Sequence, residues 1–138
     1  MTFVLDCSVT MAWCFDDEAD RYTNAVLESL ANEDVIAPAI WPLEVSNVLL
    51  VAERRRRLDR ADTERFLDLV GSLPIAVEEL GFRRATGDVL GRAREFGLSA
   101  YDGAYLELAM RAGLSLATRD RGLRAASRKA GVPLFDPR

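Results

Sequence analysis

Histidine is absent from this 138-residue chain. Its absence removes the Ser-His-Asp and Cys-His catalytic systems, imidazole acid–base catalysis and most zinc and copper sites together. If the chain catalyses a reaction, we therefore expect carboxylates to carry the chemistry.

Lysine, cysteine and long apolar runs are also scarce. Of the 18 basic residues 17 are arginine, and Lys129 lies in a basic C-terminal segment, which argues against catalysis through a lysine. Cys7 and Cys14 lack a CxxC spacing, so we interpret them as small buried residues. No apolar run approaches the roughly 18 residues of a membrane span, and the N-terminus lacks the features of a signal peptide. We expect a cytoplasmic protein with no membrane partner.

The composition predicts a single domain over residues 1–138. Apolar residues make up 49% of the chain, enough for a sizeable core, and no Pro/Ser-rich linker divides it. We interpret Trp13 and Trp41 as core or interface residues. The net charge of -4 argues against broad coating of a polyanion, so contact with nucleic acid would depend on local arginine patches.

Short apolar runs alternate with helical patterns along the chain. The expected strands are residues 3–5, 35–37, 75–77 and 114–117, with a further candidate at 133–135. The expected helices are residues 19–30, 42–57, 60–73, 82–96, 100–112 and 121–130. Strands interleaved with helices predict an α/β layered domain built on a parallel sheet.

Two carboxylates directly follow predicted strands. Asp6 ends the first strand, where its simplest role is to cap the helix that follows. Asp120 follows the strand at 114–117, where it or Thr118 could cap the last helix.

Two further carboxylates lie near the starts of predicted helices. Glu44 falls in the first turn of the helix begun by Pro42, at the border of its apolar stripe. Asp102 lies three residues after Ser99 in a pattern that resembles a capping box, and it adjoins an apolar stripe that begins at Tyr101. Both side chains are expected at the border of the core.

Capping alone does not require these acids to share a location. The turns that follow parallel strands lie along one edge of the sheet, where ligands of open α/β folds bind, so we expect Asp6, Glu44 and Asp120 to gather there. Asp102 is the exception in this argument, because a helix rather than a strand precedes it. Clustered carboxylates raise one another's pKa values unless a cation neutralises them. Oxygen ligands without His or Cys favour Mg²⁺ or Mn²⁺, which suits phosphodiester hydrolysis.

Four segments in this order resemble the PIN domain, and within it the VapC-type ribonuclease toxins of prokaryotic toxin–antitoxin pairs. They are FVLDCSV, PLEVSNVL, LSAYDGAYLELA and LATRDRGL. The match covers nearly the whole chain. The resemblance implies a PIN-like three-layer α/β/α sandwich with a short parallel sheet of four or five strands.

The resemblance also implies the site. Asp6 and Asp102 match the principal ligands of Mg²⁺ or Mn²⁺, and Glu44 and Asp120 complete the acid pocket directly or through water. The implied reaction is endonucleolytic hydrolysis of RNA by a metal-activated water, which leaves a 5′ phosphate and a 3′ hydroxyl.

Two hydroxyl residues match positions that border the acids in relatives. These are Ser8 and Thr118. Some relatives carry a further acid or amide near the position of Thr118, whereas this chain has only the threonine. It therefore lacks a ligand that a second metal ion would use.

The resemblance implies two protein partners as well as RNA. Family members pair as homodimers and are silenced by a VapB-like antitoxin that wraps the toxin and can place an arginine in the acid pocket. The apolar faces of the helices between residues 19 and 73 are candidate surfaces for both. Arg119 and Arg121, beside the pocket, and Arg54 are candidates for contact with RNA phosphates, although a solvated helix surface would also account for each arginine.

Two other interpretations stay open. DCSVT resembles the nucleophile loop of a haloacid-dehalogenase-like phosphatase, but Ser8 stands where a second acid is expected and Lys129 is poorly placed. Alternatively, the domain is a non-catalytic interaction module whose acid pocket binds an arginine of a partner.

Overall fold

Every strand of the central sheet runs parallel to its neighbours. The computed structural model describes residues 1–137. The strands are β1 (Thr2–Leu5), β2 (Asp34–Ala37), β3 (Ile75–Val77) and β4 (Ser115–Ala117), in the order β3-β2-β1-β4. β1 and β4 are the most completely buried strands. Phe3, Val4 and Leu5 of β1 and Leu116 and Ala117 of β4 are all 0% exposed. Such continuous apolar runs are typical of parallel strands covered on both faces.

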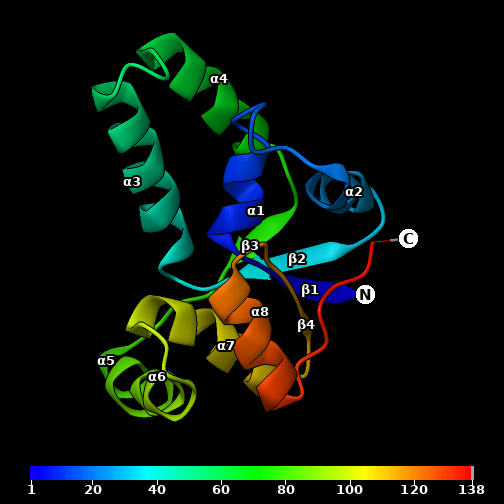
Figure 1. Ribbon diagram of the computed structural model, residues 1–138, viewed down its shortest axis with the longest axis vertical. Helices are drawn as coiled ribbons and strands as arrows, with labels where there is room; N and C mark the ends of the chain where they lie inside the picture. The colour runs from blue at the N-terminus through cyan, green and yellow to red at the C-terminus, as the bar shows by residue number, and fades with distance from the viewer. Residues whose placement is uncertain (138) are drawn as a thin grey trace.

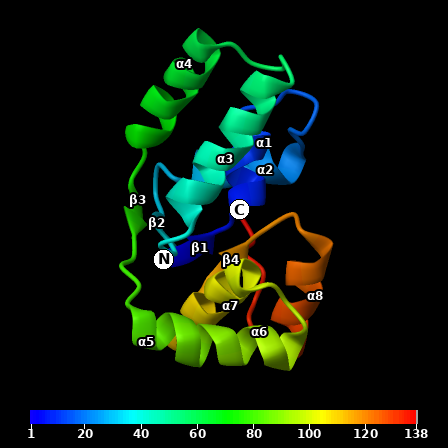
Figure 2. The same ribbon diagram turned by 90° about the vertical axis from the view of Figure 1, so that its left-hand side faces the viewer.

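Helices cover both faces of this sheet (Figures 1 and 2). One layer contains α1 (Cys7–Ala12), α2 (Arg21–Ser29), α3 (Trp41–Arg54) and α4 (Arg60–Gly71). The other contains α5 (Phe82–Arg84), α6 (Leu90–Phe96), α7 (Ala100–Ala112) and α8 (Arg121–Ala130). The predicted α/β/α sandwich on a parallel sheet is therefore confirmed.

The order of the strands creates a switch point between β1 and β4. The chain passes from β1 to β2 and on to β3 through the layer of α1 to α4, then returns to the far side of β1 through α5 to α7. The first turns of α1, α3 and α8 consequently lie at the same end of the sheet (Figure 1). This is the position where open α/β sheets bind ligands.

The predicted helix at 82–96 is continuous but not regular. A π-helical turn, η1 (Ala85–Val89), joins α5 to α6, and Figure 2 shows the three as one continuous rod. The predicted helices at 100–112 and 121–130 coincide with α7 and α8.

Two expectations are wrong. The candidate strand at 133–135 makes only an isolated bridge between Leu116 and Leu134, so the sheet has four strands. Tyr101 does not join the buried stripe of α7, because its side chain is 59% exposed. α7 instead buries every residue from Gly103 to Ala109, and a helix surrounded by core carries no amphipathic pattern for the sequence to reveal.

The interpretation of both tryptophans fits this packing, whereas the interpretation of the cysteines as buried holds for Cys7 alone. Trp41 is 6% exposed and its indole Nε1 donates to Thr10 Oγ1 at 2.9 Å. Trp13 is half-buried, with its Nε1 donating to the Thr23 carbonyl at 2.8 Å. Cys7 is buried, whereas Cys14 is half-buried. Within residues 1–137, no helix combines the length and apolar composition that crossing a membrane requires.

The central place of α7 can be tested by truncation of Leu106. Because Leu106 is 0% exposed, Leu106→Ala should lower the free energy of unfolding by about 2–5 kcal/mol. Phe82 of α5, which is 82% exposed, is the control, and its truncation should cost only about 0.5 kcal/mol. Urea unfolding followed by circular dichroism measures both. Similar losses in the two variants would contradict the assignment of α7 to the core.

Candidate active site

The four predicted carboxylates line one cavity at the switch point. This cavity has a volume of about 520 Å³, and we call it the acid cavity. Its lining residues are Asp6, Cys7, Ser8, Met11, Glu18, Glu44, Val48, Asp102, Arg119 and Asp120. Both helical layers contribute to it, so the four acids meet only because the sheet brings their elements together.

Asp6 is the most deeply buried of the four acids. It is 5% exposed and caps α1, while its backbone N–H donates to the Ala117 carbonyl at 3.0 Å. Its Oδ2 accepts hydrogen bonds from Ser8 Oγ at 2.5 Å and from Thr118 Oγ1 at 2.7 Å. Burial raises the pKa of Asp6, the two hydroxyl bonds oppose that rise, and the charge of Asp120 adds to it. Oδ1 accepts no hydrogen bond from the described residues.

The turn between β4 and α8 is held in place by the same hydroxyls. Thr118 Oγ1 accepts from the Asp120 N–H at 3.0 Å, and Ser8 Oγ accepts from the Arg119 N–H at 3.0 Å. Asp120 caps α8, with its Oδ2 accepting from the Leu123 N–H at 2.8 Å. The capping interpretation of Asp120 is therefore correct, and it coexists with a place in the acid cavity.

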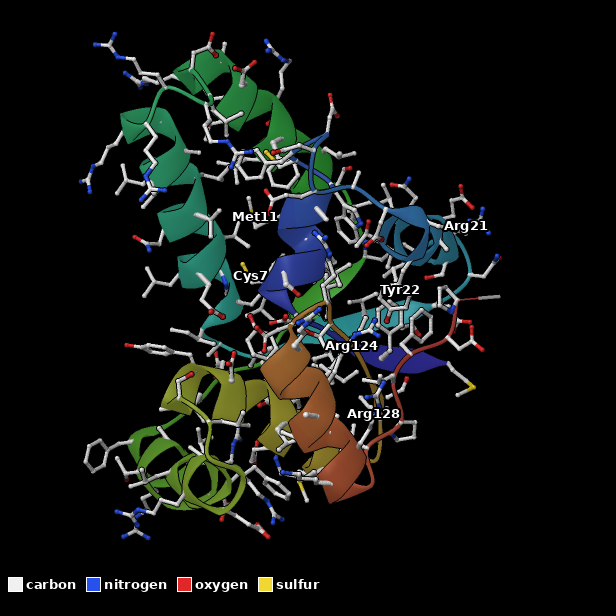
Figure 3. All side chains as sticks on the ribbon, in the orientation of Figure 1. Cys7, Met11, Arg21, Tyr22, Arg124 and Arg128 are labelled. Carbon is white, nitrogen blue, oxygen red and sulfur yellow. The ribbon has the colours of Figure 1, made fainter. Side chains whose placement is uncertain are left out.

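Arg124 of α8, in the second helical layer, contacts the turn between β4 and α8. Its Nε donates to the Thr118 carbonyl at 2.7 Å, and its guanidinium lies 5.0 Å from the centre of the Tyr22 ring. Figure 3 shows Arg124 of α8 reaching toward Tyr22 of α2. The position of Thr118 thus depends on an arginine that does not itself line the acid cavity.

Glu44 reaches the acid cavity from the first turn of α3. Pro42 occupies an early helical position as expected, and Glu44 is half-buried at the border of the stripe formed by Trp41, Val45 and Leu49. Glu44 Oε1 accepts a hydrogen bond from the Tyr105 hydroxyl at 2.6 Å. Burial raises the pKa of Glu44, the Tyr105 bond lowers it, and the charges of Asp6 and Asp102 raise it further.

Asp102 joins the set from the first turn of α7. Its backbone N–H donates to the N-cap Ser99 Oγ at 3.1 Å, as the sequence pattern predicted. The next residue, Gly103, allows α7 to pack closely, since a Cβ there would lie 3.0 Å from the Ala93 Cβ. Burial, with the charges of Asp6 and Asp120, raises the pKa of Asp102 to about 6.

The oxygen ligands and the negative charge of these four acids suit the binding of a hard cation. Each of Asp6, Glu44 and Asp102 has a pKa raised in part by another member of the set. Such mutual repulsion is relieved by a bound cation, and carboxylate oxygens are the ligands that Mg²⁺ and Mn²⁺ prefer.

The carboxylates do not converge on one point by themselves. Across residues 1–137, no three acidic or cysteine side chains are already close enough to hold a metal ion. Asp6, Glu44 and Asp120 instead each direct one oxygen to a donor of the protein. Mg²⁺ commonly keeps several waters between itself and its protein ligands, so carboxylates at this spacing can hold it through water.

The sequence matches a known family over most of its length. A family model described as the PIN domain matches residues 3–129, a span that contains all four acids. The chain belongs to the PIN domain family. No curated protein matches it significantly.

Solved structures share the fold of this PIN domain. PAE2754 from Pyrobaculum aerophilum is 26% identical, with a TM-score of 0.71 over 91% of this chain and 84% of the other. FitAcB from Neisseria gonorrhoeae is 24% identical, with a TM-score of 0.62 over 99% and 98% of the two chains. VapBC2 from Rickettsia felis, solved bound to a DNA fragment from its promoter, is 13% identical, with a TM-score of 0.67 over 98% of each of the two chains.

The structure places the three candidate arginines differently. Arg119 lines the acid cavity of the PIN domain, with its Nε 3.5 Å from Asp20 Oδ2. Arg121, the first residue of α8, and Arg54, near the end of α3, are exposed and do not line the cavity. Their contact with RNA stays a prediction.

Sequence reasoning missed four lining residues of the cavity, which are Cys7, Met11, Glu18 and Val48. The run Asp16-Asp17-Glu18 was visible as an acidic segment, but no strand or helix end marked it as part of the site. Burial and the charges of Glu44 and Asp6 raise the pKa of Cys7 well above its ordinary value. A raised thiol pKa suits a packing role rather than nucleophilic chemistry.

Removal of the Asp102 charge should stabilise the metal-free protein in a pH-dependent way. Burial and the neighbouring charges raise the pKa of Asp102 in the folded protein to about 6, above its ordinary value of 3.8. The folded state therefore binds more protons than the unfolded state between these values, and the contribution of Asp102 to stability falls as pH rises through that window. In EDTA, Asp102→Asn should have a higher Tm than wild type at pH 7.5, and the difference should vanish near pH 4. A difference that stays constant with pH would contradict the raised pKa.

Proposed function

We propose that this PIN domain is a metal-dependent endoribonuclease, the toxin of a VapBC-type toxin–antitoxin pair acting in the cytoplasm. The observation that carries the proposal is the acid cavity, where Asp6, Glu44, Asp102 and Asp120 from separate segments meet at the switch point. PIN domains are generally nucleases. The four motifs resemble those of VapC-type toxins, and the fold is similar to that of the VapBC2 structure.

The four carboxylates would hold Mg²⁺ or Mn²⁺. When bound, the ion would supply an activated water and would offset negative charge at the scissile phosphate. Ser8 and Thr118 serve the site by donating to one oxygen of Asp6, which fixes that side chain and leaves its other oxygen without a protein donor. Arg119 at the wall of the cavity would meet an RNA phosphate.

The proposal extends to two protein partners. An antitoxin that silences the enzyme would neutralise the acid cavity, for which an arginine is suited by charge. Exposed apolar side chains on the helices between residues 19 and 73 would supply surface for that partner and for a homodimer. They include Leu43 and Leu50 of α3 and Leu67 and Leu69 of α4, which are 44% to 67% exposed. Leu43 and Leu50 line one groove with Ile40 and Tyr101, and a contiguous exposed apolar surface of this kind is typical of an interaction site.

The phosphatase alternative finds less support. Its loop would need a second acid where Ser8 donates to Asp6, and a lysine near the phosphate, whereas no lysine lines the acid cavity. The interaction-module alternative shares the same cavity and differs only in the absence of cleavage.

Cleavage of RNA should require both a divalent ion and the buried acid. With partner-free protein and total cellular RNA, we expect cuts with Mg²⁺ or Mn²⁺, none in EDTA, and 5′ phosphate ends on mapping. Asp6→Asn should lower the rate at least about 100-fold, as expected for a lost metal ligand. Asp68→Asn, which alters an exposed acid of α4, is the matched control and should cleave like wild type. Cleavage that persists in EDTA, or wild-type protein that cuts nothing with either ion, would overturn the proposal.

The two arginines near the site should behave differently. Because Arg119 lines the acid cavity and Arg121 does not, Arg119→Gln should raise KM for RNA several-fold and lower the salt dependence of binding by about one ionic contact. Arg121→Gln should have a smaller effect on both quantities. Fluorescence anisotropy of a labelled RNA across a salt series, in Ca²⁺ to prevent cleavage, gives the comparison. Equal effects would remove the special role of Arg119.

A further inference from the structure

Tyr105 links the two helices that carry Glu44 and Asp102. It lies in α7, is 0% exposed, and donates its hydroxyl to Glu44 Oε1 on α3 at 2.6 Å. The two residues are 61 positions apart in the sequence. This hydrogen bond is therefore a tertiary contact that ties an acid of one helical layer to the other layer.

The contact constrains the Glu44 side chain in a way that backbone structure does not. A glutamate in the first turn of a helix has several accessible rotamers, and holding one of them costs conformational entropy. The Tyr105 hydroxyl occupies Oε1, and among the described residues no donor reaches Oε2. One oxygen is thus anchored while the other is left for a ligand.

The other acids of the cavity are oriented by different means. Asp6 is held by two hydroxyls at the sheet edge, and Asp120 by the backbone of α8 that it caps. Glu44 caps no helix, and among the described residues its side chain accepts no hydrogen bond from its own helix α3. Its only anchor among the described residues is Tyr105.

We propose that Tyr105 is a positioning residue that fixes the Glu44 carboxylate for capture of a divalent cation in the acid cavity. This inference rests on the proposed function only for the cation site, not for cleavage of RNA. Groups that orient metal ligands through a second hydrogen bond commonly change metal affinity about 10- to 100-fold when removed.

Tyr105→Phe separates this role from core packing, because it keeps the buried ring and removes only the hydroxyl. Tyr101→Phe is the matched control: it removes a hydroxyl from the same helix, at a side chain that is 59% exposed and that makes no hydrogen bond within residues 1–137. Circular dichroism and urea unfolding establish that both variants fold.

The readout is direct binding of Mn²⁺, measured by electron paramagnetic resonance of the free ion, without RNA. We expect Tyr105→Phe to weaken Mn²⁺ binding about 10- to 100-fold, while Tyr101→Phe binds like wild type. The same comparison in a Glu44→Ala background tests the route of the effect. There Tyr105→Phe should have no further effect, because the carboxylate that it positions is gone.

Three outcomes would overturn the inference. Mn²⁺ binding by Tyr105→Phe equal to that of wild type would show that the hydroxyl is not needed, and equal weakening in both backgrounds would show a general effect on packing. Wild-type protein that binds no Mn²⁺ would remove the cation site and the inference with it. Mn²⁺ binding with the expected cycle but without cleavage of RNA would contradict only the proposed nuclease.

Discussion

The buried carboxylate of Asp6 is the constraint on which the rest of the site depends. It ends the central strand, caps the helix that follows, and receives two hydroxyls, one of which, Thr118, comes from the far side of the switch point. An ionised carboxylate at 5% exposure costs several kcal/mol unless donors surround it. The two hydroxyls that donate to buried Asp6 also accept backbone N–H groups of the turn between β4 and α8. The hydrogen bonds that stabilise Asp6 therefore also position Asp120.

Gathering further acids around Asp6 works against stability. The pKa values of Asp6, Glu44 and Asp102 are all raised, which means that the fold resists ionisation at the place where the proposed function requires it. Such strain is typical of sites that await a ligand of opposite charge. A divalent cation and an arginine of a partner would both relieve it, which gives one physical basis for the proposed activity and for its proposed inhibition.

The helix ends show why simple interpretations and functional ones can both be correct. Asp6 and Asp120 do cap helices, and Ser99 does receive the N–H of Asp102, as their local patterns indicated. A cap places a carboxylate at a helix N-terminus, and a parallel sheet collects those N-termini at one edge. The position of the site was therefore predictable. The role of Tyr105 was not predictable, because a tyrosine inside an apolar helix is typical of a core residue.

The sequence by itself determined the strands, the helices and the identity of the four acids, because periodicity, capping residues and alternation of elements are local properties. Only the tertiary structure decided that the segment at 133–135 forms a single bridge, that Tyr101 is exposed, and that Arg119 rather than Arg121 or Arg54 lines the cavity. It also decided that Tyr105 meets Glu44. These outcomes depend on which surfaces pack against each other across large separations in the chain, and no local pattern encodes that geometry.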